Sequence, residues 1–85
     1  MALALKASIR IAETERGLIL LDGRDGQYYE LNDSAADMLR ALIGGMTTAD
    51  AARQISERYG VGTGLALTDL SGLIQRLTDL GMVTP

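Results

Sequence analysis

The sequence predicts an α+β fold in which an N-terminal three-stranded antiparallel meander is followed by three helices. Strand signals continue as far as Leu31, and from Asn32 onward apolar residues recur with the period of a helix. Because strands and helices occupy separate parts of the chain, we expect a segregated plan rather than an alternating one. With 85 residues, the chain is expected to form a single domain over residues 1–85 around one modest core.

Three stretches carry the strand signals. In Ala7–Thr14, two isoleucines lie two residues apart, which is the period of a half-buried strand. A polar turn ending at Gly17 leads to the apolar run Leu18–Leu21, and two Asp-Gly pairs then predict a loop before the third strand, Gln27–Leu31. Residues 1–6 precede the first strand and are expected to form a loose N-terminus.

The first two helices have recognisable start signals. Asn32 or the aspartate after it can cap a helix over Ser34–Ile43, and a Gly-Gly pair ends that helix. Thr47, with Asp50 three residues later, resembles a capping box that opens a second helix over Thr48–Tyr59.

The third helix follows a glycine-rich connection, Gly60–Gly64. It is expected to run from about Leu65 to Leu80 and to end at Gly81. Met82 and Val83 then predict a short extended return.

Composition excludes several classes of chemistry. The sequence contains no Cys and no His, so disulfides, thiolate metal sites and the commonest general base are absent. We therefore expect no enzyme activity, no metal and no cofactor. Eight basic and eleven acidic residues give a net charge of −3 without a basic cluster, which argues against nucleic acid as a partner. No apolar run approaches the ~18 residues of a membrane span, and a cytoplasmic protein without a targeting signal is expected.

Two glycine-rich loops suggest ligand-binding interpretations that their spacing does not support. Gly60–Gly64 matches neither nucleotide-binding fingerprint and follows a helix, so a helix–helix connection is the preferred interpretation. Asp22 and Asp25 lack the alternating ligands and the later Glu of a calcium loop, so a hairpin loop is preferred there.

The last helix has a wider apolar arc than a single docking face needs, spanning about 140° at about 100° per residue. Four leucines form one core stripe: Leu70, Leu73, Leu77 and Leu80. Leu67 and Ile74 lie at one edge of this stripe, beside the small residues Ser71 and Thr78. Two interpretations stay open: a broad core helix, or a surface groove with Leu67 and Ile74 in one wall.

The third strand, Gln27–Leu31, is last in the meander, so one of its edges has no partner unless another element covers it. Exposed edges can accept an extended peptide as an added strand. Tyr28 and Tyr29 would supply aromatic surface there, although tyrosine is also an ordinary strand residue.

The residues of this strand and the following helix resemble a known family. Gly26 to Asn32 (GQYYELN) and the following Ser34 to Leu39 (SAADML) match the G-x-Y-x-x-L-N-x-[ST]-[AG] passage of PqqD-like proteins, the RiPP recognition elements. Further similar passages follow in the same order: Gly44 to Thr47, Ala51 to Ala52, Ile55 to Gly60, and Asp69 to Leu70. The resemblance spans about Gly17 to Val83 and is strongest to the free-standing leader-peptide-binding proteins of lasso-peptide biosynthesis.

This resemblance implies a winged-helix-like α+β fold that binds the leader of a ribosomally made precursor peptide. In the family, the leader adds as a strand beside the third strand and packs on the third helix. The precursor then passes to a separate leader peptidase and an ATP-dependent macrolactam synthetase, the lasso cyclase. The corresponding peptide-binding residues here are Gln27, Tyr28, Tyr29, Glu30, Leu31, Leu67, Leu70, Ser71 and Ile74. The family's connector before the third helix often carries Pro or acidic residues, whereas here it is glycine-rich.

The sequence therefore predicts a non-catalytic leader-peptide-binding module. A winged-helix DNA-binding domain is the first alternative, which the net charge of −3 and the single basic residue of the last helix, Arg76, disfavour. A small protein–protein adaptor or inhibitor is the second.

Overall fold

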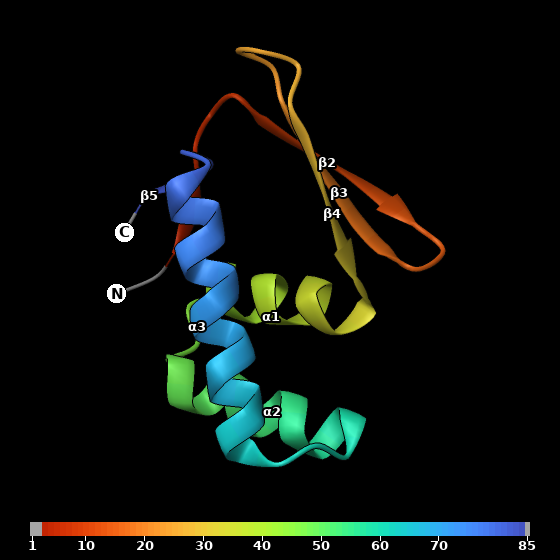
Figure 1. Cartoon of the computed structure of the whole chain (residues 1–85), viewed down its shortest axis with the longest axis vertical. Helices are drawn as coiled ribbons and strands as arrows, with labels where there is room; N and C mark the ends of the chain where they lie inside the picture. Colours follow the sequence, from red (N-terminus) through yellow and green to blue (C-terminus); the bar gives the residue numbers. More distant parts are fainter. Residues whose placement is uncertain (1–2, 85) are drawn as a thin grey trace.

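Two antiparallel sheets and three helices make up the fold (Figure 1). A computed structural model describes residues 3–84. The strands are β1 (Ala4–Leu5), β2 (Ile9–Thr14), β3 (Gly17–Asp22), β4 (Tyr28–Asn32) and β5 (Val83–Thr84). The helices are α1 (Asp33–Ile43), α2 (Thr48–Tyr59) and α3 (Thr63–Asp79). The predicted α+β order of a meander and three helices is confirmed, with α3 beginning at Thr63 instead of about Leu65.

The larger sheet has the strand order β2-β3-β4, and a glycine sets how closely β3 approaches β4. Gly17 has φ 148° and is directly opposite Asn32. A Cβ at this position would lie 1.9 Å from the carbonyl oxygen of Leu31. Only glycine fits such a close approach, so Gly17 fixes the end of β4 against the start of β3.

The smaller sheet joins the two ends of the described chain. Ala4 is opposite Thr84 and Leu5 is opposite Val83 in an antiparallel pair. The structure thus differs from the loose N-terminus expected for residues 1–6, because β1 finds a partner 80 residues later in the chain. Residues 1 and 2 lie outside the described residues.

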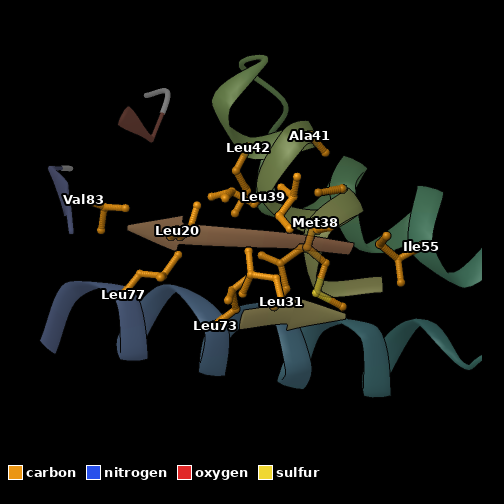
Figure 2. Packing of buried hydrophobic residues seen from close by; sticks show 14 of the residues in the cluster. Leu20, Leu31, Met38, Leu39, Ala41, Leu42, Ile55, Leu73, Leu77 and Val83 are labelled. Atoms are coloured by element: carbon orange, nitrogen blue, oxygen red, sulfur yellow. The ribbon is translucent and has the colours of Figure 1, made fainter. Parts of the chain in front are cut away.

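One hydrophobic core lies between the inner face of the larger sheet and the helices. Figure 2 shows Leu20 and Leu31 of the sheet beneath Leu39 of α1, with Leu73 and Leu77 pointing at the sheet from α3. The largest fully buried apolar side chains come from every layer: Leu20, Leu39, Ile55, Leu70, Leu77 and Met82. Because each such burial contributes about 1.5–3 kcal/mol, this core holds the sheet and the helices in one body.

The predicted helix signals are confirmed. The Asn32 side chain accepts a hydrogen bond from the Ala35 N–H at 2.9 Å and caps α1. Thr47 Oγ1 accepts from the Asp50 N–H at 3.1 Å and caps α2. Gly60 ends α2 in the left-handed conformation, and the glycine-rich segment after it connects two helices, as expected.

An ion pair with a buried carboxylate and a half-exposed arginine joins the β3–β4 loop to the residues after α3. The Asp22 side chain is only 1% exposed and accepts hydrogen bonds from Arg24 Nε at 3.1 Å and Arg24 Nη2 at 2.6 Å. Arg24 Nη2 also donates to the carbonyl oxygen of Gly81 at 3.0 Å. The side-chain and backbone hydrogen bonds from Arg24 hold the pKa of the Asp22 carboxyl well below its ordinary value of 3.8.

The depressed pKa of Asp22 makes stability depend on pH in a definite direction. Its ionised form stabilises the fold above the ordinary value of 3.8, and this contribution is lost as pH falls below that value. We expect the urea midpoint of unfolding to fall between about pH 5 and about pH 2. In Asp22→Asn the midpoint should be lower at neutral pH and should change less over that acid range.

Asp79→Asn is the matched control, because Asp79 is exposed and its one hydrogen-bond donor among residues 3–84 is Gln75 of the same helix. It should keep the parent's pH dependence. An Asp22→Asn variant with the parent's acid sensitivity would contradict the role given to this ion pair.

Candidate functional site

An open groove runs between β4 and α3. It consists of two hollows of about 930 Å³ and 470 Å³. The larger hollow is lined by the β2–β3 turn, the sheet, the start of α1 and one face of α3: Thr14, Glu15, Arg16, Leu18, Ile19, Glu30, Leu31, Asn32, Ala35, Asp69, Gly72 and Leu73. The smaller hollow is lined by the start of β4 and the end of α3: Gly26, Gln27, Tyr28, Leu80 and Met82. Tyr29 and Arg76 line both hollows, which therefore form one continuous groove.

The direction of the backbone groups of β4 follows from one hydrogen bond at its start. The Asp22 N–H donates to the Gln27 carbonyl oxygen at 2.8 Å. These two residues are directly opposite in the register that pairs Leu20 with Tyr29, so they occupy a hydrogen-bonded position of the ladder. Because such positions alternate along antiparallel strands, Tyr29 also turns its N–H and C=O toward β3.

The residues between these positions turn the other way. Tyr28 and Glu30 direct their N–H and C=O groups away from β3, toward the other edge of β4. In residues 3–84 no strand pairs with that edge, and the groove lies along it. β4 therefore offers the backbone donors and acceptors of both residues to an incoming extended chain.

The side chains of β4 divide between the two faces of the sheet. Leu31 is buried and Tyr29 is half-buried on the inner face, beside the groove. Tyr28 and Glu30 lie on the opposite face, where the Tyr28 side chain is 65% exposed. The same strand thus contributes side chains to the core and free backbone groups to the edge.

One polar contact spans the groove. Arg76 Nη1 of α3 donates to the Tyr29 hydroxyl oxygen of β4 at 2.7 Å. The guanidinium carbon lies 5.9 Å from the centre of the Tyr29 ring, within the range of a cation–π interaction. This contact joins the two walls where the two hollows meet.

Gly72 leaves space in the α3 wall of the groove. It lies in the middle of a helix of 17 residues, where glycine costs about 0.5–1 kcal/mol relative to alanine. A Cβ at Gly72 would meet no atom within 4 Å, and its φ is not left-handed. Neither packing nor backbone conformation therefore requires glycine there, and the space belongs to the groove.

The structure brings only part of the predicted site together. The strand residues Gln27–Leu31 all line the groove. The expected helix residues Leu67, Leu70, Ser71 and Ile74 do not line it: Leu70 is fully buried in the core and Leu67 is 38% exposed elsewhere on α3.

The expected helix residues lie outside the groove because of the rotational position of α3. The groove face of the helix consists of residues spaced three, four and seven apart: Asp69, Gly72, Leu73, Arg76 and Leu80. At about 100° per residue, Leu67 and Ile74 lie about 150° around the helix from the centre of this face. The core stripe has two edges, and the sheet lies against the edge opposite the expected one. A signal for the groove face did exist in the sequence, namely a glycine in the middle of a long helix.

The charged residues that line the larger hollow form no ion pair within the described chain. These residues are Glu15, Arg16, Glu30, Asp69 and Arg76. In residues 3–84 no group of three or more His, Cys, Asp or Glu side chains could hold a metal ion. No helix in this part of the chain is long and apolar enough to cross a membrane.

A free strand edge beside a partly apolar groove is typical of modules that bind an extended peptide by strand addition. Comparison with protein families identifies the kind of module. The chain belongs to the PqqD family, because the model described as "Coenzyme PQQ synthesis protein D (PqqD)" matches residues 17–83. The predicted resemblance to PqqD-like RiPP recognition elements is thereby confirmed.

Two solved structures are similar to nearly the whole chain. One, described as "Lasso peptide synthetase B1 complexed with the leader peptide", is 36% identical, with 100% of each chain covered and a TM-score of 0.92. The other, "TbiB1 in Complex with the TbiA(beta) Leader Peptide", is 18% identical and shares the fold, with 94% of this chain and 93% of that chain covered and a TM-score of 0.83. The comparison with curated proteins found no match.

Replacing either of two glycines by alanine should change the stability of the fold, in opposite directions for the two positions. Gly72→Ala should raise the free energy of unfolding by about 0.5–1 kcal/mol, because alanine is the better helix former and the space is free. Gly17→Ala should lower it by more than that, because the new Cβ would collide with the Leu31 carbonyl. Thermal and urea unfolding would measure both changes. A destabilised Gly72→Ala would mean that this glycine serves the fold rather than the groove.

Proposed function

We propose that this chain binds the leader peptide of a ribosomally made, lasso-type precursor and catalyses no reaction itself. The observation that carries the proposal is the free edge of β4, with the outward backbone groups of Tyr28 and Glu30 beside the groove. The 36% identical structure that holds a leader peptide supports it, as does membership of the PqqD family. In this role the chain acts in the cytoplasm, where precursors are synthesised.

The leader adds to the sheet as a fourth strand in this proposal. Its backbone exchanges hydrogen bonds with Tyr28 and Glu30, and each such bond contributes about 0.5–1.5 kcal/mol net. Alternate side chains of an added strand point to the inner face. There they enter the groove against Leu31 and Leu73, with the space at Gly72 beside them.

Apolar burial in the groove supplies sequence preference and most of the affinity. The backbone bonds accept any extended peptide, whereas the shape of the groove selects the side chains that fit. The walls are already in place in the free protein, so the peptide alone is ordered on binding, which lowers the entropic cost.

We further propose that binding delivers the precursor to a separate leader peptidase and an ATP-dependent lasso cyclase. A leader held along β4 leaves the rest of the precursor outside the groove, where other proteins can reach it. The module then acts by raising the local concentration of the precursor near those enzymes.

Leader binding is directly measurable. A fluorescein-labelled leader of the precursor encoded beside this chain's gene should bind one to one, with rising fluorescence anisotropy and a weak dependence on salt. The protein alone should neither cleave the precursor nor hydrolyse ATP. A labelled DNA duplex is the control and should not bind, because the groove contains few basic residues and the net charge is −3. A correctly folded protein that binds no such leader would refute the proposal.

Proline substitutions along β4 test strand addition itself. Glu30→Pro removes an outward N–H, so it should leave thermal unfolding nearly unchanged and weaken leader binding about tenfold or more. Tyr29→Pro removes an N–H that faces β3, so it should destabilise the fold. Calorimetry of binding and thermal melts of the same samples would separate the two effects.

Glu30→Ala is the matched control for the outward position, because it removes the side chain and keeps the backbone donor. It should bind the leader within about twofold of the parent. If a folded Glu30→Pro variant binds as tightly as Glu30→Ala, the leader is not held by backbone pairing at this edge.

A further inference from the structure

Arg76 holds a central place in the groove. It is the only residue of α3 that lines both hollows. Among residues 3–84 its side chain donates to a neutral group, the Tyr29 hydroxyl, from Nη1 at 2.7 Å. A guanidinium has five N–H donors, so most of the hydrogen-bonding capacity of Arg76 is available to a ligand.

The charge of Arg76 is not compensated by the described chain. Four other arginines each lie within 4 Å of a carboxylate: Arg24, Arg40, Arg53 and Arg58. Arg76 has no such partner among residues 3–84, although Asp69 and Asp79 lie on the same helix. Arg16, the other basic residue of the groove, is next to Glu15 on the β2–β3 turn.

We infer that Arg76 is a specificity-determining residue that selects leaders with an Asp or Glu side chain at the middle of the groove. This inference rests on the proposed function. A planar guanidinium matches a carboxylate with two parallel hydrogen bonds. The contact with Tyr29 already orients the Arg76 side chain, so less conformational freedom is lost when the carboxylate binds.

The position of the acidic side chain follows from strand addition. A residue of the added strand opposite Tyr29 shares its face of the sheet, with Cβ atoms about 4.5–5.5 Å apart. The side chain of that leader residue therefore points into the groove beside the Tyr29 ring, over which Arg76 lies. At the other end of the larger hollow, Asp69 would repel a carboxylate. The charges of the groove thus favour one register of the leader.

A double-mutant cycle tests this inference. Each Asp and Glu of the labelled leader is replaced in turn by Asn or Gln, and binding is measured to the parent protein and to Arg76→Gln. Replacement of the acidic residue that lies opposite Tyr29 should weaken binding to the parent protein about five- to tenfold at low salt. The same replacement should change binding to Arg76→Gln by less than about twofold. Arg76→Glu should prefer the leader in which that acidic residue is replaced by Lys.

Arg53→Gln is the matched control, because Arg53 is an exposed arginine of α2 that does not line the groove. It should leave every one of these affinities unchanged. The inference is overturned if Arg76→Gln weakens the parent leader and all neutralised leaders by one common factor, which would make Arg76 only a link between the walls. Tight binding of a leader without any Asp or Glu would also overturn it. Failure of every leader to bind the parent protein would instead refute the proposed function, and this inference with it.

Discussion

The ion pair of Asp22 and Arg24 joins two chain segments that adjoin the groove walls, the β3–β4 loop and the residues after α3. β4 and α3 come from distant parts of the chain, and Arg24 reaches the Gly81 carbonyl across 57 residues. Burying the Asp22 carboxylate costs desolvation energy, which is offset because Arg24 satisfies both of its oxygens. Arg24 is thereby held in one orientation, and its hydrogen bond to the Gly81 carbonyl links the β3–β4 loop to the residues after α3.

Alternation along β4 lets one short strand perform two tasks. Tyr29 and Leu31 bond to β3 and place their side chains on the inner face. Tyr28 and Glu30 leave their backbone groups at the free edge and their side chains on the outer face. Because successive residues are separated in this way, the demands of folding and of ligand binding fall on different positions.

The sequence predicts the meander and the three helices well because local signals decide these elements, whereas β1 depends on a pairing with β5 at the other end of the described chain. Alternating apolar residues, Asp-Gly pairs and helix caps can each be recognised within a few residues of sequence. The structure has the meander strands and the helices close to the predicted bounds. β4 as the last strand of the meander, and hence as a candidate binding edge, also follows from chain order alone.

The helix wall of the groove could not be predicted in the same way. A wide apolar stripe has two edges, and only tertiary packing decides that the sheet lies beside Asp69 and Arg76 rather than beside Leu67 and Ile74. The direction of the β4 backbone groups depends likewise on the bond between Asp22 and Gln27, which is a property of register. Three of the α3 residues that were missed, Asp69, Gly72 and Arg76, are polar or small, whereas hydrophobic periodicity detects only the buried face.

The pairing of β1 with β5 gives the chain nearly the connectivity of a ring. Ala4 is opposite Thr84, and opposite Cα atoms in such a pair are about 4.5–5.5 Å apart, a distance that one or two residues can span. A circular permutant could therefore be closed at this point and opened in the exposed α1–α2 connection, Gly44–Met46, without cutting β4 or α3. The order in which sheet and helices leave the ribosome would then depend on where the ring is cut, while the architecture around the groove stays the same.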